Sequence, residues 1–317
     1  MQKVAAVIVT YNRCELLKEN IECLFRQSYP LDILVVDNNS TDGTFDFLQS
    51  FIEEKKLTYF NTGENLGGAG GFQCGFKKAV ALGYEYLWVM DDDCMPTSDA
   101  LQKLMEADSQ LDGKYGFLSS KVLWKDGTIC TMNVQRRKLT KAVKKFDKPL
   151  IPVVMASFVS FFVKSEVVRE LGLPIKEFFI WTDDWEYSRR ISRKYPCYVV
   201  TESTVVHKSN SNIGANIATD SPDRLDRYRY LYRNDVYLYR REGFKGFCYQ
   251  AVRLSAHYIR ILFKAKDNKR ERIKQLVSGT KEGRSFNPAI EYVDANEIGN
   301  NTGTEHLKDT DKSNESS

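Results

Sequence analysis

The chain has 317 residues, of which 42% are hydrophobic and 28% are charged, and its net charge is +4. This composition is typical of a globular protein with one large domain, or with one domain and an appendage. No apolar run is long enough for a membrane-spanning helix, and the N-terminus shows no signal-peptide cleavage site. The seven scattered cysteines form no CxxC pair, which argues against a disulfide framework or a zinc site and favours a cytoplasmic protein.

The first half of the chain alternates between strand-like and helix-like segments. Apolar runs predict strands over 4–10, 33–37, 57–60 and 86–90, and helical spacing predicts helices over 13–27, from about 41 to 54, and from a Gly-rich stretch to about 82. An apolar run over 153–163 predicts a further buried strand, and the 223–240 segment predicts a helix. This order predicts an α/β protein with a mostly parallel central sheet flanked by helices.

Charge is unevenly distributed near the C-terminus. Residues 240–289 carry 13 Lys or Arg against 4 Asp or Glu, whereas residues 290–317 carry 2 Lys against 7 acids and should be disordered. The 244–265 segment has helical spacing with one apolar and one basic side. The apolar side comprises Phe244, Phe247, Ala251, Tyr258 and Leu262, and the basic side comprises Lys245, Arg253, Arg260 and Lys264. This pattern is typical of a helix on an anionic membrane surface, and the alternative is a helix packed on the core with a solvated basic face.

Three consecutive acids, Asp91, Asp92 and Asp93, follow the predicted strand over 86–90. Like charges at the end of a buried strand repel one another and lose hydration, so the cluster is costly unless a cation neutralises it. Carboxylate oxygens suit a hard ion such as Mg²⁺ or Mn²⁺. The alternative is a solvated acidic loop.

Polar residues also follow the first two predicted strands. Thr10, Asn12 and Arg13 come after the first, and Asp37 comes after the second. Ligands of open parallel sheets bind at these carboxyl ends of strands. Thr10 and Asn12 can hydrogen-bond a base or ribose, Asp37 can accept from a uracil N–H or a ribose hydroxyl, and Arg13 can offset phosphate charge. Together these residues predict a nucleotide pocket, although each residue type is also common in turns.

A glycine-dense segment over 65–72 includes Asn65, Gly67 and Gly68. Glycines let the backbone approach a ligand closely, and the N-terminus of a following helix favours anions. The segment is not a dinucleotide fingerprint, because position 73 is Gln and the segment follows the third strand, and it lacks the ending of a P-loop. The alternative is a flexible entry into a helix.

A second acidic cluster lies between two tryptophans and precedes a predicted helix. It comprises Trp181, Asp183, Asp184, Trp185 and Glu186. Aromatic faces stack on sugar rings, and a carboxylate can deprotonate an attacking hydroxyl. The alternative is that an aspartate caps the helix. Further along, His207 follows an apolar pair at a probable strand end and is either a metal ligand beside the aspartates or a structural histidine.

These segments, in this order over residues 3–240, resemble family 2 glycosyltransferases of the GT-A fold. The 65–72, 88–93 and 181–187 segments are similar to those of bacterial galactofuranosyltransferases. The resemblance implies a GT-A glycosyltransferase domain over 1–240, followed by the basic helical extension over 241–289 and the acidic tail over 290–317. It also implies an inverting, metal-dependent transfer from a nucleotide sugar.

The resemblance implies a role for each candidate residue. Asp91 and Asp92 would lie near the ribose and uridine, while Asp93 and His207 would hold Mg²⁺ or Mn²⁺. Asp184, with Asp183 as the alternative, would be the base. The acceptor would be positioned by Trp181, Trp185 and Glu186, and the nucleotide sugar would also contact Thr10, Asn12, Arg13, Asp37, Asn65, Gly67 and Gly68.

Our main hypothesis is transfer of galactofuranose from UDP-galactofuranose to a lipid-linked or polysaccharide acceptor. The enzyme would be peripheral on the cytoplasmic face of the membrane, with a UDP-sugar and an anionic lipid surface as partners. Rhamnosyl transfer from dTDP-rhamnose is the alternative enzymatic reading, and a non-catalytic nucleotide- or glycan-binding protein is the alternative of another class. Nucleic acid is not an expected partner, although Tyr230, Tyr232 and Tyr258 near the basic block could stack on bases.

Overall fold

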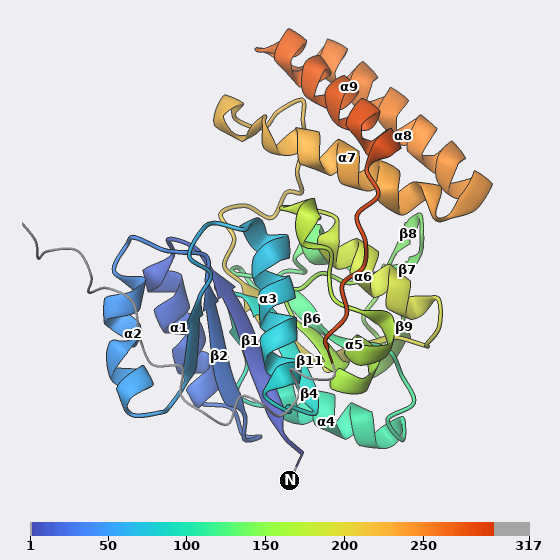
Figure 1. The fold of residues 1–317 in the computed structure, drawn as a ribbon. Coiled ribbons are helices and arrows are strands. Elements are labelled where there is room, and N and C mark those ends of the chain that lie inside the picture. Colours follow the sequence, from blue (N-terminus) through green and yellow to red (C-terminus); the bar gives the residue numbers. More distant parts are fainter. Residues whose placement is uncertain (1, 295–317) are drawn as a thin grey trace, which may run out of the picture.

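The computed structural model describes residues 2–294, and the predicted disorder of residues 295–317 lies outside the described part. Within residues 2–294, one nine-stranded sheet forms the centre of the molecule (Figure 1). Its first block consists of the parallel strands β3-β2-β1-β4 in that order. These strands are β1 (Val4–Thr10), β2 (Asp32–Asp37), β3 (Thr58–Asn61) and β4 (Tyr86–Asp91). Thr10 lies opposite Asp37, and Val9 lies opposite Asp91, so the polar strand ends meet at one edge.

The second block of the sheet is mixed. Its strands are β5 (Cys94–Pro96), β6 (Phe117–Trp124), β9 (Leu150–Pro152), β10 (Phe161–Lys164) and β11 (Tyr198–His207). β10 runs antiparallel to β4 and β6, whereas β6 and β11 are parallel. β5 pairs with the end of β11, which places His207 opposite Cys94, directly after the three acids. A separate hairpin is formed by β7 (Arg136–Lys138) and β8 (Lys141–Ala142).

The apolar run over 153–163 was predicted as one strand, and that prediction is wrong for most of its length. Only Phe161–Lys164 is a strand. The preceding residues are largely buried but irregular, and their N–H groups bond to scattered partners, such as Val154 to Arg136 O and Ala156 to Ser188 Oγ. The continuous apolar run therefore correctly indicated that this segment is buried. It did not indicate the secondary structure, because it contains no alternation that would distinguish a strand from a buried loop.

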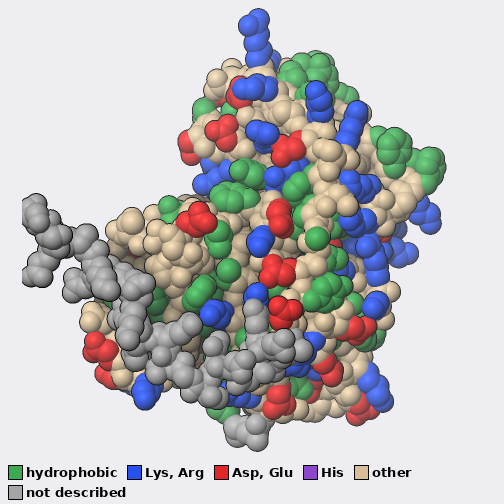
Figure 2. All heavy atoms as spheres, viewed as in Figure 1, with side chains coloured by type: hydrophobic (Ala, Val, Ile, Leu, Met, Phe, Trp, Pro, Cys, Tyr) green, Lys and Arg blue, Asp and Glu red, His purple; other side chains and the backbone are tan. Residues whose placement is uncertain are grey.

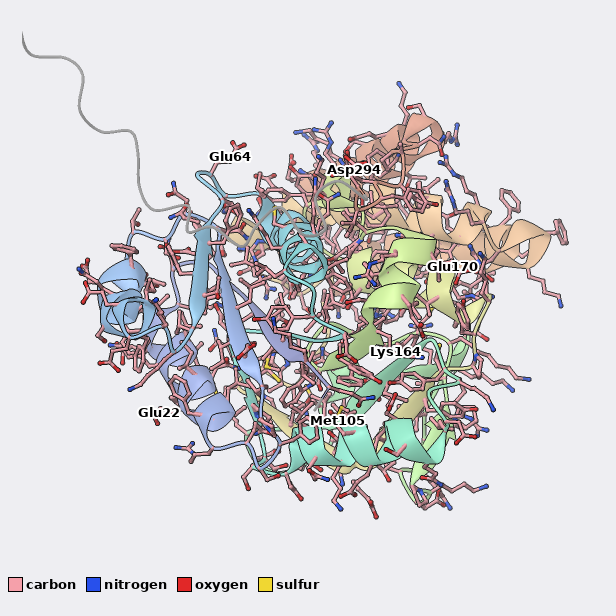
Figure 3. The ribbon with its side chains drawn as sticks, turned by 60° about the horizontal axis from the view of Figure 1, so that its bottom comes forward. Glu22, Glu64, Met105, Lys164, Glu170 and Asp294 are labelled. Carbon is pink, nitrogen blue, oxygen red and sulfur yellow. The ribbon has the colours of Figure 1, made fainter. Side chains whose placement is uncertain are left out.

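Helices cover both faces of the sheet. One face carries α1 (Cys14–Phe25), α2 (Thr44–Glu53) and α4 (Ala100–Gln110), whose apolar sides pack around the fully buried Trp88. Figure 3 brings the lower end of the molecule forward and labels Met105 on α4. The other face carries α3 (Gly67–Ala81), α5 (Ser165–Leu171) and α6 (Asp183–Ser192). Three short 3₁₀ turns connect elements: η1 (Thr131–Asn133), η2 (Lys176–Phe178) and η3 (Pro222–Arg224).

A layer of three helices lies above the carboxyl-end edge of the sheet (Figure 1). It consists of α7 (Arg227–Arg240), α8 (Gly243–Lys264) and α9 (Lys269–Ser285). α7 and α9 approach closely at Gly279, where an added Cβ would lie 2.4 Å from the carbonyl oxygen of Arg229. Because α7 shares an apolar cluster with α8 and α9, the helical layer begins before the boundary expected at residue 240.

Residues 290–294, the start of the expected acidic tail, are packed against the sheet domain. The carbonyl oxygen of Glu291 accepts a hydrogen bond of 2.8 Å from the N–H of Leu173. The carboxylate of Glu291 pairs with Lys77 and Lys176 at 3.2 and 3.4 Å. Within residues 2–294, no helix has the length and apolar character needed to cross a membrane.

Candidate active site

The site lies where β1, β2 and β4 end, beneath the helical layer. Ligand atoms of Asp91, Asp93 and His207 all lie within 4.8 Å of one another. Asp91 was expected beside the ribose and uridine; the structure groups it with the candidate metal ligands, and its contact with a nucleotide remains a prediction. Asp91 ends β4, and Asp92 and Asp93 lie in the turn that follows. The turn brings Asp91 and Asp93 together with His207, whereas Asp92 accepts a hydrogen bond from Thr10 at the end of β1.

The histidine is oriented by a residue that sequence reasoning did not identify. His207 Nδ1 lies 2.8 Å from Asn133 Oδ1, and the amide oxygen can only accept, so Nδ1 carries the proton. Nε2 lies 3.0 Å from Asp93 Oδ1, so a protonated ring donates to that oxygen, whereas a neutral ring has its lone pair on Nε2 and could share a cation with the oxygen. Metal-binding histidines are commonly held in this way by a hydrogen bond from the second ring nitrogen.

The residues fit a divalent cation. The buried Asp93 Oδ1 lies 3.0 Å from His207 Nε2, and unless that nitrogen carries a proton the oxygen has no hydrogen-bond donor within residues 2–294, an arrangement that is costly unless a cation satisfies it. Two carboxylates and one imidazole suit Mn²⁺, and the carboxylates also suit Mg²⁺. Burial lowers the pKa of His207. The hydrogen bond with Asp93 and the charges of Asp93 and Asp91 outweigh this effect and raise the pKa to about 10. The negative charge of Asp91 and Asp93 can therefore be offset either by a proton on His207 or by a bound cation.

Asp92 is tied to the first strand rather than to the metal group. It accepts a 2.8 Å hydrogen bond from Thr10 Oγ1, and Arg13 Nη1 contacts both Asp92 and Asp93, at 3.3 and 2.7 Å. Arg13 thus offsets carboxylate charge in the structure, where phosphate charge was expected. Burial raises the pKa of Asp92 to about 6 and that of Asp91 to about 7, with the other acids of the triplet contributing.

Two predicted nucleotide contacts are engaged within the protein. Asp37 is fully buried, and its carboxylate accepts hydrogen bonds from Ser40 and Tyr59. Asn12 has a positive φ of 51° and holds the neighbouring loop through a 2.7 Å bond from Thr41 N–H to its side-chain oxygen. Both residues shape the two strand-end loops, and direct contact with a nucleotide remains a prediction.

The glycine-dense segment is mainly a packing device. Gly67 has φ +70°, and an added Cβ would lie 2.2 Å from the carbonyl oxygen of Phe179, while an added Cβ on Gly71 would lie 2.5 Å from Val9. Asn65 closes the turn by accepting from Gly67 N–H at 2.9 Å. Gly68 and Phe72 are the residues of this segment that border the site pocket, and an added Cβ on Gly68 would meet nothing within 4 Å.

A pocket of about 540 Å³ joins the two acidic clusters. Its walls include Asp91 on one side and Asp183 and Asp184 on the other, together with Trp181 and Trp185. The volume is within the range of roughly 300–1,000 Å³ for small-molecule sites. The sequence prediction that the acids and tryptophans share a site is consistent with this arrangement.

Asp183 and Asp184 begin helix α6. Burial raises the pKa of Asp183 to about 6, and burial together with the charges of Asp183 and Asp91 raises the pKa of Asp184 well above its ordinary value. Hydrogen bonds from N–H groups at the helix N-terminus, including the 2.6 Å bond from Trp185 N–H to Asp184 Oδ1, oppose this rise. A carboxylate with a raised pKa is a stronger base, which suits proton abstraction from a hydroxyl.

Glu186 was predicted to position the acceptor, and the structure places it elsewhere. It is 3% exposed, is not part of the pocket wall, and forms an ion pair of 2.7 Å with Arg190. Arg190 in turn donates to the carbonyl oxygens of Leu171 and Leu173. Glu186 and Arg190 are four residues apart on α6 and therefore lie on the same side of the helix, which is not the side that borders the pocket.

The loop before α6 is strained. Phe179, Trp181 and Thr182 all have positive φ, between 62° and 71°. Non-glycine residues in this region cost roughly 1–3 kcal/mol each and persist only when neighbours hold them. The buried Asn234 of α7 supplies that support, since its Nδ2 lies within 3.2 Å of the carbonyl oxygens of Phe178, Ile180 and Trp181.

Charged residues of the helical layer and of the β7–β8 hairpin also border the pocket. Asp235 is buried, accepts a 3.2 Å bond from Thr182 Oγ1, and pairs with Arg253 of α8. Arg136 borders the same space, with its guanidinium 4.0 Å from the centre of the Trp185 ring. Sequence analysis did not identify Asp235 or Arg136 as site residues, because their partners Thr182 and Trp185 lie far away along the chain.

Comparison with known proteins agrees with this geometry. The family model "Glycosyl transferase family 2" matches residues 5–165. The chain belongs to glycosyl transferase family 2. It is 25% identical over 256 residues to galactofuranosyltransferase GlfT1 of Mycolicibacterium smegmatis, covering 76% of this chain and 84% of that protein. It is 24% identical over 267 residues to the Mycobacterium tuberculosis protein of the same name, covering 77% and 84%.

Solved structures show the same fold. S. aureus TarS matches with a TM-score of 0.54 and 15% identity over 90% of this chain, which spans 44% of the TarS chain. The mannosyltransferase PcManGT from Pyrobaculum calidifontis, solved with GDP-Man and Mn²⁺, matches with a TM-score of 0.54 and 17% identity over 88% of this chain and 75% of that chain. The expected GT-A fold is confirmed, and glycosyltransferase activity is supported.

Proposed function

We propose that this glycosyltransferase transfers galactofuranose from UDP-galactofuranose to a sugar hydroxyl of a lipid-linked or polysaccharide acceptor, with inversion. The observation that carries the proposal is one pocket bordered on one side by Asp91, a member of the Asp91–Asp93–His207 group, and on the other by Asp183 and Asp184. The similarity to two proteins named galactofuranosyltransferase supports the donor sugar.

The chain's own residues divide the reaction between them. Asp91, Asp93 and His207 would hold Mg²⁺ or Mn²⁺, whose charge stabilises the negative charge that develops on the departing UDP. Thr10, Asp92 and Arg13 fix the wall on the β1 side through their hydrogen bonds. The nucleotide is released as the bond from its diphosphate oxygen to the sugar breaks, and the acceptor oxygen forms the new bond from the opposite side.

Asp184 takes the proton from the acceptor hydroxyl. It is less buried than Asp183 and borders the pocket, while Asp183 is 7% exposed and raises the pKa of Asp184 through its charge. The rings of Trp181 and Trp185 offer stacking surfaces for the sugars. The guanidinium of Arg136 packs against the Trp185 ring and helps to hold it in place. Glu186 has no direct role in this mechanism.

The enzyme is also proposed to work at an anionic membrane surface on the cytoplasmic side. The outer side of α8 exposes large apolar side chains to an unusual extent, including Phe244 at 80%, Val252 at 70% and Phe263 at 83%. Lysine and arginine side chains surround hydrophobic ones on the helical layer (Figure 2). An exposed apolar stripe with basic flanks is the pattern of an interfacial helix.

A panel of sugar nucleotides tests the donor. With Mn²⁺ present, UDP release from UDP-galactofuranose should exceed that from UDP-glucose and UDP-galactopyranose by at least about tenfold, since donor discrimination of this size needs only about 1.4 kcal/mol. Turnover of dTDP-rhamnose without turnover of UDP-galactofuranose would favour rhamnosyl transfer. Binding of UDP without turnover of any donor would favour a binding protein.

A further inference from the structure

A second concave site lies in the helical layer, on the opposite side of α7 and α8 from the active-site pocket. It is a groove of about 630 Å³ between α7, α8 and α9. Neighbouring residues separate the two spaces, since Asp235 and Arg253 border the active-site pocket whereas Val236 and Leu254 border the groove. The groove is therefore close to the active site but is not part of it.

The walls of the groove are mostly apolar and continue onto an exposed surface. Phe244 and Phe247 border it and are 80% and 64% exposed, and Ala251 borders it one turn further along α8. The same side of α8 continues to Tyr258 and Leu262, which are 42% and 39% exposed. If the exposed apolar side of α8 lies in the surface of a lipid bilayer, a groove that opens onto it can receive a hydrocarbon chain from that bilayer.

An unsatisfied amide lies in the groove wall. Gln250 is 8% exposed, and its buried Nε2 has no hydrogen-bond partner within residues 2–294. A buried donor without a partner is costly, so its persistence points to an oxygen supplied from outside the chain. The ester and glycerol oxygens of a lipid are suitable acceptors.

Two guanidinium groups give the groove a positive rim. Arg240 donates to the carbonyl oxygens of Gly283 and Phe286 and so closes the end of α9, while keeping its charge beside the groove. Arg284 is exposed, and its guanidinium forms no hydrogen bond or ion pair among the described residues. Guanidinium groups beside an apolar cleft match a phosphate attached to a hydrocarbon chain.

We infer that this groove binds one hydrocarbon chain of an anionic phospholipid from the bilayer, with the lipid phosphate at Arg240 and Arg284 and a backbone oxygen of the lipid at Gln250. Bound in this way, a lipid anchors α8 on the membrane beside the active-site pocket. The site is independent of the identity of the donor sugar.

The test is titration of the full-length protein with monomeric palmitoyl-lysophosphatidylglycerol, followed by calorimetry. Saturable binding of one lipid is expected. Ala251→Trp fills the groove and should weaken binding at least about tenfold, a change of about 1.4 kcal/mol. The matched control is Ala256→Trp, an equally exposed position of α8 outside the groove, which should leave the affinity unchanged. Thermal unfolding of both variants verifies the fold.

The headgroup is tested with a second pair of variants. Arg284→Gln should weaken binding about fivefold, as expected for one cation near a lipid phosphate, while Lys281→Gln, on the same helix but outside the groove, should not. Lysophosphatidylcholine should bind more weakly than lysophosphatidylglycerol.

Three results would overturn the inference. They are an absence of saturable lysophosphatidylglycerol binding, equal effects of Ala251→Trp and Ala256→Trp, and binding of farnesyl diphosphate in the groove without binding of the lysophospholipid. A dimer that Ala251→Trp dissociates, with no lipid binding, would instead assign the groove to self-association. Donor turnover is measured separately without lipid, so failure of the transferase proposal is distinguishable.

Discussion

Asn234 should control catalysis although it does not border the active-site pocket. Its amide holds three carbonyl oxygens of the segment that leads into α6, at 2.9, 3.2 and 2.9 Å. Asn234→Ala removes these bonds and leaves the carbonyl groups of Phe178, Ile180 and Trp181 without this donor. At about 1 kcal/mol for each of two amide hydrogens, the free energy of unfolding should fall by roughly 2–3 kcal/mol.

The effect on activity should be larger than the loss of stability suggests. Without Asn234, the positive-φ residues Trp181 and Thr182 can relax, and the start of α6 with Asp184 moves with them. A displacement of about 1 Å at a reacting group can cost on the order of 100-fold in rate. We therefore expect kcat to fall about 100-fold, with little change in the affinity for UDP, because the proposed nucleotide site lies on the β1–β4 side.

The assay is steady-state release of UDP with the best donor of the panel, together with calorimetric binding of UDP and chemical unfolding. A matched control is Asn287→Ala, which also removes an asparagine side chain, in this case one that accepts from Arg240 and Arg241 at the surface. That variant should retain kcat. Unchanged kcat and stability in Asn234→Ala would refute the support role, and an equal loss of UDP affinity would show that the variant disturbs the whole site.

Three further variants test separate parts of the structure. Gly71→Ala should lower stability by about 1–3 kcal/mol in chemical unfolding because its Cβ would overlap Val9, whereas Gly68→Ala, with nothing within 4 Å, should not. Asp184→Asn should reduce kcat by about 10²–10⁴-fold with UDP affinity retained, while Glu186→Gln should mainly lower the thermal midpoint; the reverse result would reassign the base. Burial and the nearby charges of Arg253 and Arg260 lower the pKa of His257 from 6.5 to about 4. The unfolded chain therefore binds the proton first, and stability should fall by up to about 2 kcal/mol between pH 7 and 5 in the native protein but less in His257→Gln.

Much of the fold was accessible from the sequence because the first half follows simple rules. The alternation of apolar runs and helical segments predicted β1 to β4 and their helices within a few residues. The strand ends then brought Thr10 and the three acids together, as the parallel arrangement requires. The second half was less accessible, since β10 runs antiparallel and the apolar 153–160 segment is an irregular buried loop.

The site was predictable only where neighbours in sequence determine it. The cluster over 91–93 and the histidine were found, but the division of roles within the triplet needed the geometry of the turn after β4. Glu186 was misplaced because helical rotation turns it towards Arg190. Asn234 and Asp235 were not identified at all, because their function depends on contacts with residues 178–182, more than 50 positions away.

Helix α8 shows what spacing along the sequence can predict and what it cannot. Its apolar side was predicted from spacing, yet a sequence alone does not say whether such a side faces the core or the exterior. In the structure the helix packs through Gly246, Gln250 and Ile261, and most of the predicted apolar side remains exposed. This orientation is the reason for proposing contact with lipid.

The most direct test of the central proposal is the affinity for UDP measured with and without Mn²⁺ in the wild type and in Asp93→Asn. If Asp91, Asp93 and His207 hold a cation that in turn holds the diphosphate, Mn²⁺ should raise the affinity of the wild type by at least about tenfold. The same addition should have little effect on Asp93→Asn. Equal affinities with and without Mn²⁺ in the wild type, or the same gain in both proteins, would contradict the proposal.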